Sequence, residues 1–156
     1  SKNTYKECVT MNDLISLASK RRERQIKYER KLLRELPVQA LKKSIQSHFN
    51  FIRLNGGAWI QRSAEEGCGD LAIESFLLGG HYSRFGFYGE TIEQTKKRCA
   101  KELKELTDTL YNDWQLWTDE TGTMQESLYY TCEQFIDYWW TEGFKKAEKR
   151  RKLRLH

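Results

Sequence analysis

The sequence predicts an all-α protein, an irregular bundle of about five helices in a single domain. Apolar residues recur at spacings of three and four along most of the 156 residues, as they do on the buried face of a helix. The chain has one proline and few clusters of turn residues, whereas an all-β fold needs many. No heptad pattern with charged flanking positions is sustained, so a bundle is expected rather than a coiled coil.

The first helix is expected over residues 11–36, opened by Thr10 with Asp13 three residues later in a cap-like arrangement. Pro37 should end this helix, because the residue before a proline disfavours helical backbone. Pro37 also suits the first position of a second helix, which is expected to continue to Ile52. The apolar positions at the start of the first helix share one face: Met11, Leu14, Ile15 and Ala18.

The third helix is expected to follow the turn at residues 55–57 and to open with a capping box formed by Ser63 and Glu66. Its dense apolar pattern makes it the best candidate for the central, most buried helix. The pair Gly79-Gly80 is expected to end it, since glycine commonly terminates helices. A loop over residues 81–89 would then follow.

A fourth helix is expected from a cap at Glu90 or Thr91 through Trp117, and a fifth from a capping box at Thr123 and Glu126. Residues 145–156 are interpreted as a basic tail that extends the last helix. Residues 1–10 are expected to be disordered or introduced during expression, and the single domain is expected to span residues 1–156.

Charge is distributed unevenly along the chain. Residues 1–62 carry 14 Lys and Arg against 5 Asp and Glu, residues 63–142 carry 6 against 16, and residues 143–156 carry 7 against 1. Such a chain can pair its basic ends with its acidic middle or present them to separate partners. The first basic cluster, over residues 20–34, is interleaved with acidic residues, which favours self-pairing on an exposed helix.

The four cysteines, at positions 8, 68, 99 and 132, form no C-x-x-C pair of the kind found in zinc sites. They are interpreted as reduced thiols packed as small hydrophobic groups. Apolar runs are far shorter than the roughly 18 residues that span a bilayer, and no secretory leader pattern is present. The sequence therefore predicts a cytoplasmic protein that is not associated with a membrane.

The basic tail and a ring-rich segment are the candidate surface for a polyanion or a protein partner. Rings and guanidinium groups stack on bases, and lysines neutralise phosphates. The alternative is that the rings of residues 83–89 close the end of the bundle while the glycines supply turns. The candidate residues are Lys145, Lys146, Lys149, Arg150, Arg151, Lys152, Arg154, Arg84, Phe85, Phe87 and Tyr88.

Glu66, Asp70 and Glu74 recur at four-residue spacing, which places three carboxylates along one face of the third helix. Such a carboxylate stripe could hold a hard cation or perform acid–base chemistry. No Glu-x-x-His pair of the di-iron type and no neighbouring histidine accompanies it, so a solvated stripe or a salt-bridge partner is the simpler interpretation. No catalytic residue, metal ligand or cofactor is assigned from the sequence.

Five segments together resemble the YbaK-type family of uncharacterised Bacillus proteins, a domain of unknown function that is distinct from the similarly named tRNA-editing deacylases. The segments are KYERKLLREL (27–36), EGCGDLAIESFLLGG (66–80), RFGFYGE (84–90), DYWWTEGF (137–144) and the closing KLRLH. The resemblance implies a Firmicute, cytoplasmic origin and no particular site residue.

The leading functional hypothesis is a non-catalytic helical domain that binds a protein partner or a second copy of itself. It follows from the surplus of aromatic residues and from the missing catalytic pairs. RNA or DNA binding through the basic ends is the first alternative. A metal-dependent enzyme that uses the carboxylate stripe is the second.

Overall fold

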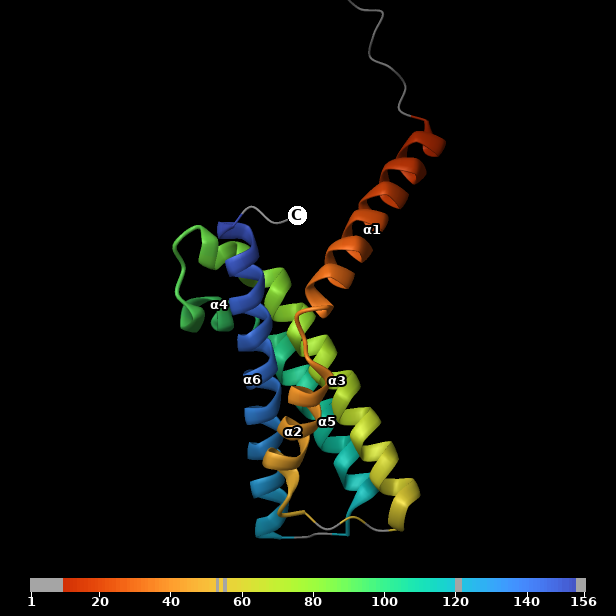
Figure 1. Cartoon of the computed structure of the whole chain (residues 1–156), viewed down its shortest axis with the longest axis vertical. Coiled ribbons are helices and arrows are strands. Elements are labelled where there is room, and N and C mark those ends of the chain that lie inside the picture. Colours follow the sequence, from red (N-terminus) through yellow and green to blue (C-terminus); the bar gives the residue numbers. More distant parts are fainter. Residues whose placement is uncertain (1–9, 53, 55, 120–121, 154–156) are drawn as a thin grey trace, which may run out of the picture. The chain divides into compact units, whose positions relative to one another are not determined.

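The computed structural model describes residues 10–52, 54, 56–119 and 122–153, and within these ranges the fold consists of six helices and no strands (Figure 1). The predicted all-α class is confirmed, with one helix more than the five expected. The chain divides into two compact units, residues 1–31 and 32–156, and each is described by itself. No helix in the described ranges combines the length and the apolar character needed to cross a membrane.

Helix α1 (Met11–Leu33) opens with the cap that the sequence predicts. The Asp13 N–H donates to Thr10 Oγ1 at 3.2 Å, and the Asp13 carboxylate accepts from the Thr10 hydroxyl at 2.8 Å. The Thr10 hydroxyl and the Thr10 backbone N–H both donate to the Asp13 carboxylate, and these two bonds hold the pKa of Asp13 below its usual value. The helix ends three residues earlier than expected, because the N–H groups of Glu35 and Leu36 form turn hydrogen bonds to carbonyls three residues back.

Helix α2 (Val38–Phe49) follows that turn and ends before the expected Ile52. Pro37 is its N-cap, with φ −71° and ψ 129°, and therefore stands one position outside the helix rather than at its first residue.

Helix α3 (Gly57–Phe87) differs most from the prediction. It begins six residues before Ser63, after a left-handed Gly56 with φ +84°, so Ser63 and Glu66 lie inside the helix and form no cap. It also continues through Gly79-Gly80, and residues 81–87 of the expected loop are its last two turns.

The two glycines allow close packing instead of ending the helix. A Cβ at Gly79 would meet the backbone carbonyl of Trp140, and one at Gly80 would meet the side chain of Leu32. Both contacts are with residues remote in sequence. Packing against these residues keeps α3 helical at the two glycines, although glycine has a low helix propensity.

The expected fourth helix is two helices, α4 (Ile92–Arg98) and α5 (Ala100–Trp117). Thr91 caps α4 in a capping box with Gln94, which settles the expected choice between Glu90 and Thr91. The break falls at Cys99, whose thiol is buried against Trp140 and Phe144 of the last helix. The chain changes direction there and keeps an apolar residue in the core.

Helix α6 (Thr123–Lys152) carries the basic run as its final turns. The expected capping box at Thr123 and Glu126 is wrong: Gly122, with φ +69°, is the N-cap, and no side chain caps the helix.

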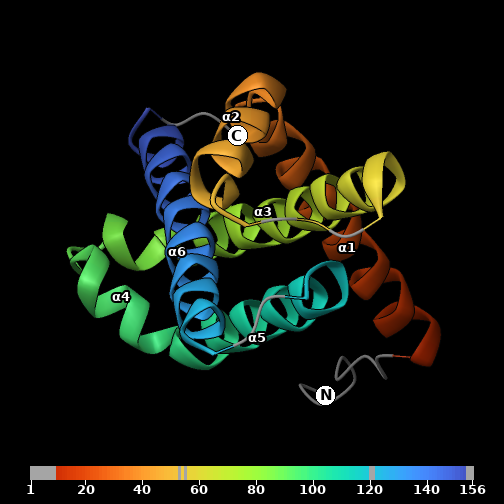
Figure 2. The ribbon, with the colours of Figure 1, turned by 90° about the horizontal axis from the view of Figure 1, so that it is seen from below.

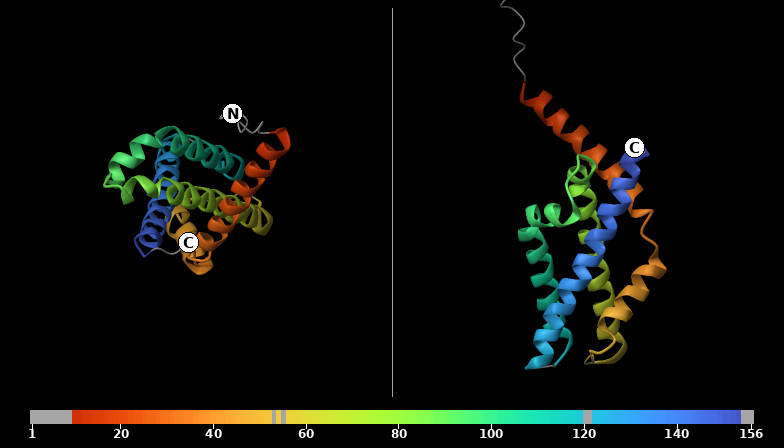
Figure 3. Two further views of the ribbon diagram at one scale, coloured as in Figure 1. Left: turned by 90° about the horizontal axis from the view of Figure 1, so that it is seen from above. Right: turned by 90° about the vertical axis from the view of Figure 1, so that its left-hand side faces the viewer.

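Helices α3 and α6 form the central pair of the second unit, and α2 and α5 pack against it on opposite sides (Figures 2 and 3). The two helices are parallel, because residues later in α3 contact residues later in α6. Ser75 Oγ donates to the Ile136 carbonyl at 2.6 Å, and Arg151 Nε donates to Ser83 Oγ at 3.0 Å. The third helix is therefore central, as predicted, and α6 shares this role. The expectation that most rings of the last helix pack in the core also holds for Trp139, Trp140 and Phe144, which are buried.

Candidate interaction surfaces

The basic tail is only partly available to a partner. Arg150 Nη1 pairs with Glu35 Oε1 at 3.2 Å, and Lys152 Nζ pairs with Glu148 Oε1 at 2.9 Å. Together with the Arg151–Ser83 hydrogen bond, these contacts engage three of the predicted site residues in the fold itself. Three tail residues remain exposed and in no ion pair within the described ranges: Lys145, Lys146 and Lys149. Arg154 lies outside the described residues.

The predicted ring-rich loop is the C-terminal end of α3. Two guanidinium groups lie over the ring of Phe85, with Arg98 4.5 Å and Arg84 5.0 Å from the ring centroid. Arg98 is itself held by Glu90 at 2.8 Å. Phe87 and Tyr88 are exposed and contact each other edge to face.

The tail and the end of α3 do meet. Gly86 packs against Phe144 and lies near the carboxylate of Glu148, in addition to the contact of Arg151 with Ser83. Both helices end here, and their C-terminal dipoles place partial negative charge at this end of the unit. The basic side chains in the last turns of α6 therefore interact favourably with these helix ends, whether or not a partner is bound.

The carboxylate stripe of Glu66, Asp70 and Glu74 is exposed on α3, and none of the three carboxylates makes an ion pair with a described residue. Ten residues, about 15 Å along the helix, separate Glu74 from Arg84, and no ion pair joins the stripe to the tail within the described residues. Across the described ranges, no three His, Cys, Asp or Glu side chains are grouped as metal ligands would be.

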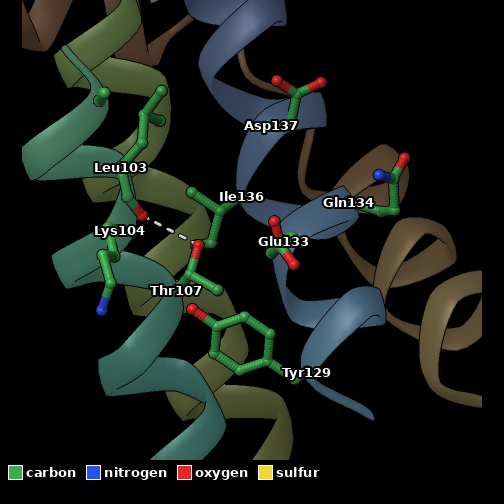
Figure 4. A pocket seen from close by; sticks show the side chains of 9 residues that line it. Leu103, Lys104, Thr107, Tyr129, Glu133, Gln134, Ile136 and Asp137 are labelled. Carbon is green, nitrogen blue, oxygen red and sulfur yellow. Dashed lines mark hydrogen bonds between the residues drawn. The ribbon is translucent and has the colours of Figure 1, made fainter. Parts of the chain in front are cut away.

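A groove between α5 and α6, with a volume of about 460 Å³, was not anticipated from the sequence (Figure 4). Lys104 Nζ and the Tyr129 hydroxyl both bind the Asp108 carboxylate, at 2.6 and 2.8 Å. These hydrogen bonds lower the pKa of Asp108, and the pKa of Tyr129 is raised by its bond to that carboxylate and by burial. Both shifts move these two groups away from titration near neutral pH.

A second groove lies between α2 and α3, with a volume of about 490 Å³. Apolar side chains of α2 and charged side chains from both helices line it, and Glu66 is the member of the carboxylate stripe among them. The lining residues are Val38, Leu41, Lys42, Ile45, Gln46, Arg62, Glu65, Glu66 and Gly69.

Cys68, Cys99 and Cys132 are free and buried, as expected for thiols packed as small hydrophobic groups. Burial raises the pKa of Cys68 to about 12 and that of Cys99 to about 11. Burial also raises the pKa of Cys132. Because the thiolate is the nucleophile, none of these residues is a reactive cysteine at neutral pH. Cys8 lies outside the described residues.

Exposed apolar side chains share one face of α1, and we call its four residues the α1 stripe: Met11, Leu14, Ile15 and Ala18. The three larger side chains are each more than half exposed. In the described part of the first unit, α1 is the only element, so no second helix of that unit covers the stripe. The sequence showed the helical spacing of these residues, but the spacing alone also fits a core-facing helix.

The six helices of the described residues define the class of protein as all-helical. The chain belongs to the family described as "Protein of unknown function (DUF2521)", whose model matches residues 11–156. It is similar to "Uncharacterized protein YbaK" of Bacillus subtilis (strain 168), with 34% identity over 155 residues that cover 93% of this chain and 99% of the relative. No solved structure matches the chain.

Proposed function

We propose that this protein is a protein-interaction module that binds a partner protein through the α1 stripe. Residues at positions i, i+3, i+4 and i+7 form the contact set of an amphipathic helix that lies in a groove or against another helix. The exposure of Met11, Leu14 and Ile15 is the observation that carries the proposal. A contiguous exposed apolar patch is a typical feature of a protein–protein interaction site.

The stability of α1 supports the same conclusion. Isolated helices are marginal in water, and tertiary packing of an apolar face supplies most of the stability of helices in proteins. The α1 cap at Thr10 fixes where the helix starts, yet the apolar side chains that follow are exposed to solvent. Contact with a partner would bury them and stabilise the first turns of the helix.

A matched pair of variants tests the proposal. Ile15→Glu places a charge in the stripe, whereas Leu17→Glu makes a comparable change on another side of the helix; the two residues are 58% and 55% exposed. The full-length chain and both variants are used as bait in a lysate of the source organism, and captured proteins, including the untagged chain itself, are identified. We expect wild type and Leu17→Glu to retain the same partner and Ile15→Glu to lose it, with equal helix content by circular dichroism. Identical capture by all three, or none by any, would overturn the proposal.

A second candidate function is binding of single-stranded nucleic acid at the end of the second unit. It is supported by exposed Lys145 and Lys149 on α6 and exposed Phe87 and Tyr88 at the end of α3, because lysines and rings together suit a phosphate backbone with unstacked bases. Fluorescence anisotropy with a labelled single-stranded RNA tests this function. Binding should fall steeply as salt rises and weaken in Lys145→Glu/Lys149→Glu, and no binding at low salt would eliminate it.

A further inference from the structure

We propose that the partner of the α1 stripe is a second copy of this chain, and that α1 of each copy docks antiparallel on the outer face of α3 of the other. This inference rests on the proposed function and names its partner. We call the following side of α3, whose residues recur at three- and four-residue spacing, its outer face: Arg62, Glu66, Asp70, Ile73 and Leu77. Arg62 and Glu66 also line the groove between α2 and α3.

The outer face of α3 changes character along its length. Ile73 and Leu77 give an apolar patch that is half-buried, and Glu66 and Asp70 precede it as exposed carboxylates. Arg62 lies one turn before Glu66 and is also exposed. Within the described residues, none of these three charged side chains forms an ion pair, so their charges are open to a partner.

Helix α1 shows the complementary order. Ile15 lies at the centre of the α1 stripe, Arg22 follows seven residues later and Glu29 seven residues after that. Seven residues are two helical turns, about 10.5 Å, and return nearly to the same side of a helix. One side of α1 therefore presents an apolar patch, a positive charge, the exposed Ile26 and a negative charge in sequence.

The spacings on the two helices match only in the antiparallel direction. With Arg22 opposite Glu66 and Asp70, Ile15 comes opposite the Ile73–Leu77 patch and Glu29 comes opposite Arg62, because the intervals on both helices are close to seven residues.

In the parallel direction the same placement of Arg22 would bring Glu29 toward Glu74 and Ile15 toward Arg62. Like charges would then face each other, and an apolar side chain would lie against a guanidinium. Charge complementarity thus selects both the second copy and the direction of docking.

A two-fold dimer uses this contact twice, since each copy contributes one α1 and one α3. This doubling matters because single exposed ion pairs contribute little. Apolar burial by the stripe would supply most of the affinity, and the charges would fix register and direction.

Charge exchange between copies tests the inference by sedimentation equilibrium of the full chain up to about 1 mM, where weak self-association becomes measurable. Wild type should dimerise. Arg22→Glu and Asp70→Arg should each weaken dimerisation by about tenfold or more, equivalent to about 1.4 kcal/mol. An equal mixture of the two variants should dimerise again. In the mixed dimer, one α1–α3 contact keeps the native Arg22–Asp70 pair, and the other joins the two substituted residues, whose charges are again opposite. Arg24→Glu, which changes an exposed charge on the opposite side of α1, should dimerise like wild type.

A wild-type chain that stays monomeric at all concentrations would overturn this inference. So would a mixture that dimerises no better than either variant alone. If the chain is monomeric but captures another protein in a manner that depends on Ile15, only this inference fails and the proposed function stands. If no capture and no self-association depends on Ile15, both fail.

Discussion

Gly79 of α3 and Gly143 of α6 lie at one helix crossing, each packed against the backbone of the other helix. A Cβ at Gly79 would meet the Trp140 carbonyl, and a Cβ at Gly143 would meet the Phe76 carbonyl. Helices approach this closely only where neither has a side chain in the contact. The crossing brings Ser75 within 2.6 Å of the Ile136 carbonyl and fixes how the two longest helices of the second unit pack.

Alanine at either glycine should therefore be strongly destabilising. The atom met by the added methyl group is in a helix backbone, which cannot move aside as a flexible side chain can. We expect Gly79→Ala and Gly143→Ala each to lower the free energy of unfolding by roughly 3 kcal/mol, at the upper end of the cost of overpacking. Urea unfolding followed by circular dichroism measures the effect.

Gly69→Ala is the control for these variants. This glycine is also inside α3, but a Cβ there would meet only a methyl group of Leu41 at an ordinary 3.8 Å. Relief of the low helix propensity of glycine should stabilise the protein by up to about 1 kcal/mol. Equal losses in all three variants would show that the crossing is not the cause.

Local sequence rules predicted two helix caps correctly and failed for two others, the capping boxes expected at Ser63 and Thr123. The caps at Thr10 and Thr91 are the two correct ones, and each involves a side chain and a backbone group three residues apart. Gly79-Gly80 was misread as a helix stop because Gly79 packs against Trp140 and Gly80 against Leu32, both far away in the sequence. The break at Cys99 was missed for the same reason, since it depends on contact with Trp140 and Phe144.

For the candidate surfaces too, the sequence predicted features that depend on local spacing and missed contacts between distant residues. Four-residue spacing correctly placed the exposed carboxylates of Glu66, Asp70 and Glu74 on α3. The engagement of the tail could not be predicted, because Glu35 and Ser83, the partners of Arg150 and Arg151, lie far away in sequence.

The Arg150–Glu35 pair should stabilise the second unit more than the other ion pair of the tail. The Arg150 side chain is 13% exposed, whereas that of Lys152, paired with Glu148 one turn earlier, is 63% exposed. Glu35→Ala leaves a largely buried guanidinium without its carboxylate and should cost about 1–3 kcal/mol in the free energy of unfolding. Lys152→Ala should change it by less than about 0.5 kcal/mol. Thermal unfolding of the two variants at low and high salt measures the difference. Equal losses of stability in Glu35→Ala and Lys152→Ala would contradict the expectation drawn from the burial of Arg150.

The buried thiols should make the protein less stable at alkaline pH. Burial raises the pKa of Cys68 from about 9 to about 12, so above pH 9 the unfolded chain loses a proton that the folded chain retains. The unfolded state then binds fewer protons, and the free energy of unfolding falls by about 1.4 kcal/mol per pH unit for each such thiol. Below pH 8 both states keep the proton and the effect vanishes.

Cys68→Ala isolates this contribution. Between pH 9 and 11, its free energy of unfolding should fall less steeply with pH than that of wild type, by about 1.4 kcal/mol per pH unit, while the two slopes agree near pH 7. Chemical unfolding at a series of pH values provides the slopes. Parallel curves throughout this range would show that Cys68 ionises in the folded protein as it does in the unfolded chain.

A hydrogen bond in the core joins α2 to α6 and supports the last prediction. The Trp139 indole N–H donates to Ser44 Oγ at 3.1 Å, and both side chains are buried. Ser44→Ala removes the acceptor and leaves a buried donor unsatisfied, which should lower the free energy of unfolding by about 1–3 kcal/mol. Ser47→Ala is the matched control, because Ser47 is exposed and its hydroxyl bonds only to the Ser44 carbonyl one turn earlier in the same helix. It should change stability by less than about 0.5 kcal/mol. If both variants unfold at the same urea concentration, the indole has found another acceptor, and the α2–α6 contact depends on apolar packing alone.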